Sequence, residues 1–227
     1  MEERKLTSLD IPGIIAHSRF ADENILGEEL ILGGVMGEDA LKNTAVLKLL
    51  RYPIRLDVYM ILFMAKGELD MNMNLDSYHL GENSILIYTP GNIMQFFLPG
   101  NNELAGMEFY FVMVSKEFIS DFRFDVGKAF KDGISPLSSP CITLDSEGAS
   151  LSNSFFQLGR TIFEHPWDGM RDALGHLFSS YLYVAMDLWE KELAKKREVQ
   201  SPSDARVHKL FEDFIVLVME YHTRERG

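Results

Sequence analysis

The stretch from Arg55 to Phe97 most constrains what this chain can fold into. It consists of short apolar segments separated by residues that favour turns, at positions 66–68, 76–77 and 89–91. Segments of this length, broken at short intervals by Gly, Pro, Asn, Asp and Ser, are typical of strands in β-sandwiches and β-barrels. The stretch therefore predicts the middle of a β-barrel.

The same pattern of short apolar segments and turn-favouring residues extends over residues 10–114, where apolar or alternating runs predict further strands. The clearest predicted strands are Ile31–Gly34, Arg55–Ala65, Ser84–Tyr88, Ile93–Leu98 and Leu104–Val114. In the run Arg55–Ala65 both alternating faces are mostly apolar, with Leu56, Val58, Met60, Leu62 and Met64 on one and Tyr59, Ile61 and Phe63 on the other. A strand buried on both faces predicts a barrel wall that helices cover from outside.

Beyond residue 115 the apolar period changes to that of a helix. Ser115 predicts the N-cap of a short helix, and Asp145 or Ser146 that of a longer one ending at His165-Pro166. Its predicted apolar stripe is Leu151, Phe155, Leu158 and Ile162. This stripe fits packing on the barrel and packing against a second copy of the chain equally well.

A second long helix is predicted from about residue 168 to 196. Its stripe contains the residues that we predict to serve a two-fold dimer interface: Leu174, Leu177, Phe178, Tyr181 and Leu188. A third amphipathic helix is predicted from Ala205 to about Thr223. The predicted organisation is a barrel over residues 1–115, a helical region over 116–200, and a linker with one further helix over 201–227.

Composition excludes several classes of function. The net charge of −12 argues against this chain itself binding nucleic acid, which requires clustered Lys and Arg to neutralise phosphates. A single cysteine, Cys141, excludes an intrachain disulfide and favours a cytoplasmic setting. No apolar run approaches the roughly 20 residues that span a bilayer, so no membrane partner is expected.

Four stretches, taken in order, resemble an AraC-type transcriptional regulator. They are residues 53–67, with the Lys-Gly-Glu turn, 78–91, with the Pro-Gly turn, 104–118 and 205–227. The resemblance implies an α+β fold: a degenerate cupin (a double-stranded β-helix or jelly-roll-like barrel) followed by a helical dimerisation hairpin. It also implies a small-molecule effector, a homodimer, and DNA contact only through a helix-turn-helix domain. That domain would begin where this sequence ends.

The resemblance also indicates the positions at which a metal-binding cupin carries its metal ligands. Metal-binding cupins carry His-x-His and Glu on the strand before the Gly turn, and a further His after the Pro-Gly turn. These positions fall on Ile54, Leu56, Met60 and Met94, which offer no nitrogen or oxygen donor. We therefore expect no metal, no other cofactor and no enzymatic activity.

The remaining candidate is a ligand site inside the barrel. By strand alternation the predicted lining is Leu56, Val58, Met60, Tyr88, Met94 and Phe96. A barrel filled by its own side chains is the alternative interpretation, because methionine suits both. The leading hypothesis is the sensor part of a transcription regulator. A metal-dependent cupin isomerase or dioxygenase, and a small-molecule binding module without a regulatory role, remain as alternatives.

Overall fold

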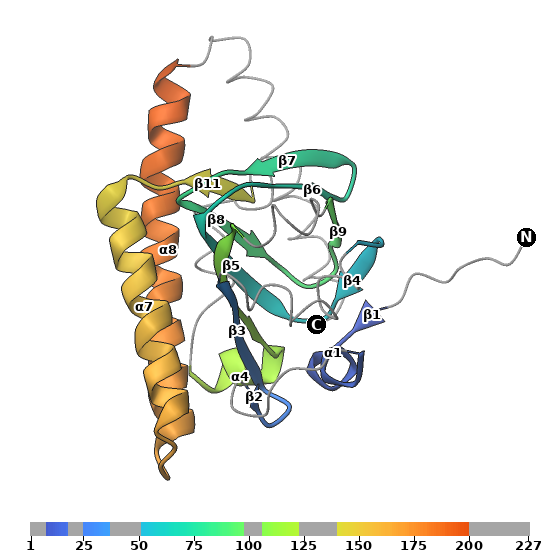
Figure 1. The fold of residues 1–227 in the computed structure, drawn as a ribbon, viewed down its shortest axis with the longest axis vertical. Helices are drawn as coiled ribbons and strands as arrows, with labels where there is room; N and C mark the ends of the chain where they lie inside the picture. The colour runs from blue at the N-terminus through green and yellow to red at the C-terminus, as the bar shows by residue number, and fades with distance from the viewer. Residues whose placement is uncertain (1–7, 18–24, 37–50, 98–105, 123–139, 200–227) are drawn as a thin grey trace, which may run out of the picture.

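Two β-sheets face each other and a layer of helices covers one of them (Figure 1). The computed structural model describes residues 8–17, 25–36, 51–97, 106–122 and 140–199. Within these residues, one sheet has the strand order β1 (Ser8–Leu9), β4 (Ile54–Leu56), β9 (Ile93–Phe97), β6 (Leu69–Met73) and β7 (Asp76–Leu80). The other has the order β11 (Cys141–Thr143), β8 (Ser84–Tyr88), β5 (Tyr59–Lys66), β10 (Glu108–Val114), β3 (Leu30–Met36) and β2 (Ile25–Leu26). The described helices are α1 (Ile11–His17), α4 (Lys116–Asp121), α7 (Ser146–Glu164) and α8 (Met170–Val199).

The predicted α+β barrel is confirmed, but one predicted strand is divided between the two sheets. The run Arg55–Ala65 forms β4 in the five-stranded sheet and β5 in the six-stranded sheet, with Asp57 and Val58 between them. The backbone N–H of Asp57 donates to the carbonyl of Leu9 (2.7 Å), outside the β4–β9 ladder. A chain that passes from one sheet to the other has to bend, and alternation alone does not reveal where.

The predicted two faces of this run are confirmed despite the break. Val58, Met60 and Leu62 belong to the core between the sheets, whereas Ile61 and Phe63 belong to the core between the six-stranded sheet and the helices. Val58 keeps its inward orientation although it lies outside both strands, and its side chain is fully buried. The six-stranded sheet is thus apolar on both faces, as the sequence predicts.

The turn predicted at Asp76-Ser77 is two residues too late. β6 ends at Met73 and β7 begins at Asp76, so the turn falls on Asn74 and Leu75. Asn74 has φ 56°, in the left-handed region that asparagine tolerates better than most residues. Its side-chain oxygen also accepts from the backbone N–H of Ile93 (3.0 Å). The contact with β9 fixes the turn here, and it joins residues far apart in sequence.

Both predicted helix caps are confirmed. The Ser115 hydroxyl accepts from the backbone N–H of Phe118 (3.1 Å) at the start of α4. The Asp145 carboxylate accepts from the backbone N–H of Gly148 (2.9 Å) at the start of α7, which ends at Glu164 with His165 as its C-cap, where the sequence predicts the stop. Each cap satisfies one of the backbone donors that a helix leaves unpaired at its N-terminus.

The apolar stripe predicted for α7 is not the face that packs on the barrel. The buried positions are Gly148, Ala149, Ser152, Phe156, Gly159 and Phe163. Leu151 and Leu158, from the predicted stripe, are 40% and 51% exposed, and its other two residues are half-buried. Small residues allow α7 to approach closely, since a Cβ on Gly159 would lie 3.1 Å from Leu32 of β3 and 3.2 Å from Phe178 of α8. The large aliphatic residues flank this contact.

The sequence pattern does not predict the helix α1. Asp10 accepts from the backbone N–H of Gly13 (2.9 Å), and Pro12 lies in the first turn, where it costs no helix hydrogen bond. Ile11 and Ile14 are 1% exposed and belong to the core between the sheets. The N-terminal segment therefore contributes directly to the interior of the barrel.

Among the described residues, no helix is long and apolar enough to cross a membrane. The predicted linker and third helix, residues 201–227, lie outside the described residues and stay a prediction.

Candidate functional site

The six predicted lining residues lie together inside the barrel. They come from β4, β5, β8, β9 and the link between β4 and β5, and all belong to the core cluster between the two sheets. None is more than 2% exposed; they are Leu56, Val58, Met60, Tyr88, Met94 and Phe96. Strand pairing places Met60 directly opposite Tyr88. Their common location is as predicted, and a ligand among them stays a prediction.

Among the described residues buried between the two sheets, Tyr88 carries a polar hydroxyl group. Its hydroxyl oxygen accepts from the backbone N–H of Leu56 (2.9 Å), and its hydrogen faces the carbonyl oxygens of Asn92 (2.5 Å) and Leu56 (3.1 Å). Tyr88 lies in the six-stranded sheet and Leu56 in the other, so the hydroxyl links the two sheets. Burial raises the pKa of Tyr88 to about 12, and the hydrogen bond to the Leu56 backbone opposes this rise.

We expect Tyr88→Phe to destabilise the fold by about 1–3 kcal/mol, because the buried N–H of Leu56 loses its acceptor. The phenol is neutral below pH 10 in both folded and unfolded chains. Since its pKa is raised on folding, its stabilising contribution is complete below pH 10 and is lost as pH rises towards about 12. Urea unfolding at pH 8 and between pH 10 and 12 measures both effects.

The variant should therefore lose part of the alkaline decrease in stability. Tyr52→Phe, which changes a tyrosine that is 66% exposed, is the control and should not alter stability at pH 8. An unchanged alkaline slope in Tyr88→Phe would show that another group causes the decrease.

The positions that the family resemblance assigns to metal ligands also meet in the barrel. Ile54 pairs with Met94 across β4 and β9, and both share one core cluster with Leu56 and Met60. Their side chains carry no nitrogen or oxygen donor for a metal such as Zn²⁺, Fe²⁺ or Mn²⁺. In the part of the chain that the structure describes, no three His, Cys, Asp or Glu side chains gather into a group that could hold a metal ion.

Methionine is frequent in the interior of the barrel. Among the described residues, seven methionines belong to the core between the sheets: Met60, Met64, Met71, Met73, Met94, Met107 and Met113. Their unbranched side chains adapt to irregular spaces and repack at low cost. The interior can therefore be filled by its own side chains and still rearrange around an apolar molecule.

A pocket of about 350 Å³ lies at the β6–β7 side of the barrel. Its lining includes Leu69, Met107 and Phe97, and Phe97 is 49% exposed. His79 lies at this pocket, with its Nδ1 2.8 Å from a carboxylate oxygen of Asp70. The pair is directly opposed across β6 and β7, so an exposed cross-strand hydrogen bond to Asp70 explains His79 without a ligand.

The residues predicted for a dimer interface are largely used within the chain. Leu174, Phe178 and Tyr181 are 0%, 4% and 0% exposed and pack into the core between the six-stranded sheet and the helices. Leu177 and Leu188 are half-buried. The α8 stripe is thus the face that holds the hairpin on the barrel, which corrects the predicted location of an interface. It does not test dimerisation itself.

The outward apolar surface of the hairpin belongs to α7 instead. Leu151 and Leu158 are exposed, and Phe155 and Ile162 are half-buried beside them. The four lie on one side of the helix, and we call them the α7 stripe. Phe155 also contacts Tyr181 of α8, with ring centroids 4.9 Å apart, so the stripe flanks the line where the two helices meet.

No protein family model matches the sequence, and no curated protein matches it significantly. Solved structures do show likeness. ToxT from Vibrio cholerae, in the apo form of a variant, aligns with 72% of this chain and 58% of its own, at 9% identity and a TM-score of 0.44. The AraC-like transcriptional activator CuxR aligns with 56% of this chain and 42% of its own, at 10% identity and a TM-score of 0.35. The cupin domain of Cnp3 from Schizosaccharomyces pombe aligns with 47% and 67%, at 13% identity and a TM-score of 0.31.

The aligned part of this chain spans less than two thirds of the ToxT structure. Because all three TM-scores are below 0.5, the fold assignment rests on the strand pairing and the two cores described above. The chain is thus similar to these AraC-like and cupin structures, and its described part is an α+β fold with two facing β-sheets and a helical layer.

Proposed function

We propose that this chain is the ligand-sensing and dimerisation portion of a cytoplasmic AraC-type transcription regulator. The observation that carries the proposal is the apolar, methionine-rich barrel interior, in which the metal-ligand positions of a cupin are occupied by Ile54, Leu56, Met60 and Met94. Such an interior supports binding of a small molecule with apolar surface, and those four positions offer no nitrogen or oxygen donor to a metal. The proposal is therefore a sensor and not an enzyme.

The mechanism is a shift between two arrangements of the helical layer. The six-stranded sheet carries the barrel interior on one face and the helical core on the other, so side chains on β5 alternate between ligand space and helix contact. A molecule that repacks the barrel interior would move this sheet relative to α7 and α8. The ligand needs only to favour one arrangement over the other to change the state of a DNA-binding domain attached to the hairpin.

A second copy of this chain is the partner that we propose for the α7 stripe. Exposed leucines beside half-buried Phe155 and Ile162 form an apolar strip on a helix whose opposite side is already packed. A two-fold axis can place the same strip of two chains against each other. DNA contact would come only from a helix-turn-helix domain, in accord with the net charge of −12 of this chain.

Native mass spectrometry with a metal scan on the same sample tests these proposals. We expect a metal-free dimer at micromolar concentration, and a retained small molecule would begin to identify the effector. Leu151→Glu and Leu158→Glu should shift the protein to the monomer, because each places a charge in the apolar contact. Leu75→Glu, at a leucine that is 100% exposed in the β6–β7 turn, is the matched control and should leave the dimer intact.

A metal bound at one per chain would overturn the sensor assignment in favour of a metal-dependent cupin enzyme. A monomer in the unmodified chain, or a dimer that is insensitive to both α7 substitutions, would overturn the proposed interface. A metal-free dimer whose ligand bears no relation to gene regulation would favour the non-regulatory binding module.

A further inference from the structure

Arg171, in the first turn of α8, joins three elements that are distant in sequence. Its guanidinium donates to both carboxylate oxygens of Glu29, in the β2–β3 turn, at 2.6 and 2.7 Å. It also donates to Asp121 at the end of α4 (2.6 Å). The same group lies 5.4 Å from the ring centroids of Phe118 and Phe122. Bidentate pairing combined with aromatic stacking fixes the geometry of an arginine in a way that a lysine could not reproduce.

The aromatic side of this contact is equally specific. A Cβ on Gly175 of α8 would overlap the ring of Phe122, so the glycine leaves the space that the ring occupies. His176 meets the same ring edge-on, with centroids 5.2 Å apart. Phe122 thus lies in a notch of α8 formed by Arg171, Gly175 and His176, and α4 and α8 are joined by both charge and packing.

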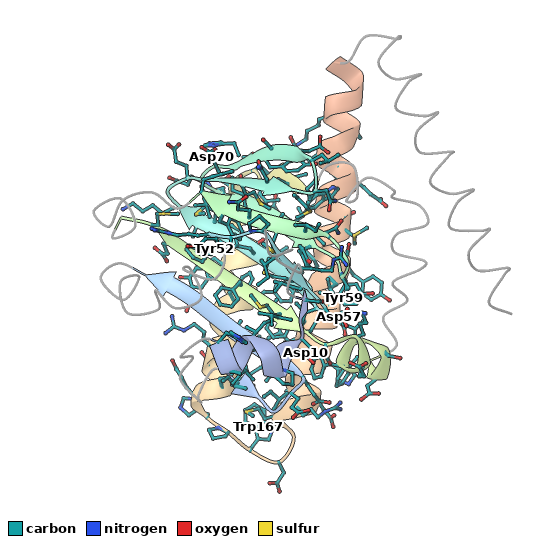
Figure 2. The ribbon with its side chains drawn as sticks, turned by 90° about the vertical axis from the view of Figure 1, so that its right-hand side faces the viewer. Asp10, Tyr52, Asp57, Tyr59, Asp70 and Trp167 are labelled. Atoms are coloured by element: carbon teal, nitrogen blue, oxygen red, sulfur yellow. The ribbon has the colours of Figure 1, made fainter. Side chains whose placement is uncertain are left out.

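The opposite end of α4 is attached to the barrel. Lys116, the first residue of α4, pairs with Asp57 (2.5 Å), and Figure 2 shows Asp57 beside this helix. Asp57 lies where the chain passes from β4 to β5, and its backbone N–H donates to the carbonyl of Leu9. The next residue, Val58, is fully buried in the barrel core. A displacement of the barrel wall at this crossing therefore acts directly on the start of α4.

We propose that α4 is the element that couples the barrel interior to the position of α8, with the Lys116–Asp57 pair at its barrel end and the Arg171 contacts at its α8 end. The inference rests on the proposed sensor function and names its regulatory route. Every step from Val58 to α8 is a covalent neighbour or a direct contact: Asp57, Lys116, the α4 helix with Asp121 and Phe122, and Arg171. Such a contiguous route couples two sites only if its ends move together, and that is a measurable property.

Residue-resolved hydrogen exchange by NMR on the full chain tests this coupling. Arg171→Gln removes the hydrogen bonds of Arg171 to Glu29 and Asp121 and leaves the packing of Phe122 against Gly175 and His176 in place. We expect amide exchange to become about fivefold faster or more in the first turn of α8, in α4 and at the N–H of Asp57. Amides in the β5–β8 ladder should keep their rates. Lys191→Gln, which removes another cation of α8 that pairs with Asp187 on its exposed face, is the control and should alter none of these amides.

Arg171→Lys retains the charge and gives a second, milder variant if the glutamine variant folds poorly. In this variant the exchange rates of the same amides should rise by a smaller factor. Faster exchange confined to the first turn of α8 would show that Arg171 stabilises only that turn, and would overturn the proposal. Uniformly faster exchange across both sheets would overturn it as well. The result is independent of whether native mass spectrometry finds a dimer, a ligand or a metal, so failure of the coupling and failure of the sensor function are distinguishable.

Discussion

Phe156→Ala is expected to destabilise this protein by about 3–5 kcal/mol, the usual cost of removing a buried phenylalanine. Phe156 is fully buried where the helical layer meets the sheet. Its ring centroid lies 6.3 Å from Phe63 of β5, 5.7 Å from Tyr110 of β10 and 5.5 Å from Tyr181 of α8. Truncation removes the side chain that all three share, and the neighbours belong to rigid elements that cannot collapse into the space.

Urea unfolding followed by circular dichroism measures this loss. Tyr183→Ala is the matched control, since it truncates an aromatic side chain of the same helical hairpin that is 57% exposed, and it should cost less than about 1 kcal/mol. Equal losses in the two variants would show that α7 and α8 do not pack on the sheet through Phe156. That result would contradict the division into two cores.

Gly33→Ala is expected to destabilise the barrel by about 1–3 kcal/mol, although alanine is ordinarily no worse than glycine in a strand. Gly33 of β3 and Phe111 of β10 are directly paired across the sheet. A Cβ on Gly33 would come within 2.8 Å of three atoms of the Phe111 ring, which belongs to the barrel core. The added methyl therefore forces the ring from its place in a closely packed interior.

A double-mutant cycle identifies the cause. Phe111→Leu combined with Gly33→Ala should cost less than the sum of the two single changes, because a leucine leaves room for the methyl group. Gly81→Ala is the control, since its Cβ would meet only His79, at 3.6 and 3.9 Å, which is ordinary contact. Additive losses in the cycle would mean that the Phe111 ring does not cover Gly33.

The sequence predicts most of the barrel because strand alternation is a local property. Ser84–Tyr88 is found at its predicted bounds, and Val58, Met60 and Ile61 face the cores that alternation assigns to them. Helix starts are equally local, since Ser115 and Asp145 bond to backbone groups three residues away. The apolar character of the metal-ligand positions needs only the sequence and a resemblance.

The features that escaped prediction depend on partners remote in sequence. α7 carries two apolar faces, and the sheet selects the one where Gly148, Ser152 and Gly159 allow close approach, while the more conspicuous leucines stay outside. The turn at Asn74 depends on Ile93, and the N-terminal residues Ile11 and Ile14 reach the barrel core only through the tertiary fold. Periodicity shows which faces of a helix are apolar, and small residues indicate which of these faces packs against the sheet.

Oxidation of the methionines in the barrel can be used to measure how often the barrel opens. All seven are at most 5% exposed, so a peroxide reaches their sulfur atoms only when the barrel opens. Oxidation of a thioether to the sulfoxide places a polar group in an apolar core and hinders the barrel from closing again. The rate of sulfoxide formation therefore measures how often the interior is exposed to solvent. Any molecule that occupies and closes the barrel will lower this rate.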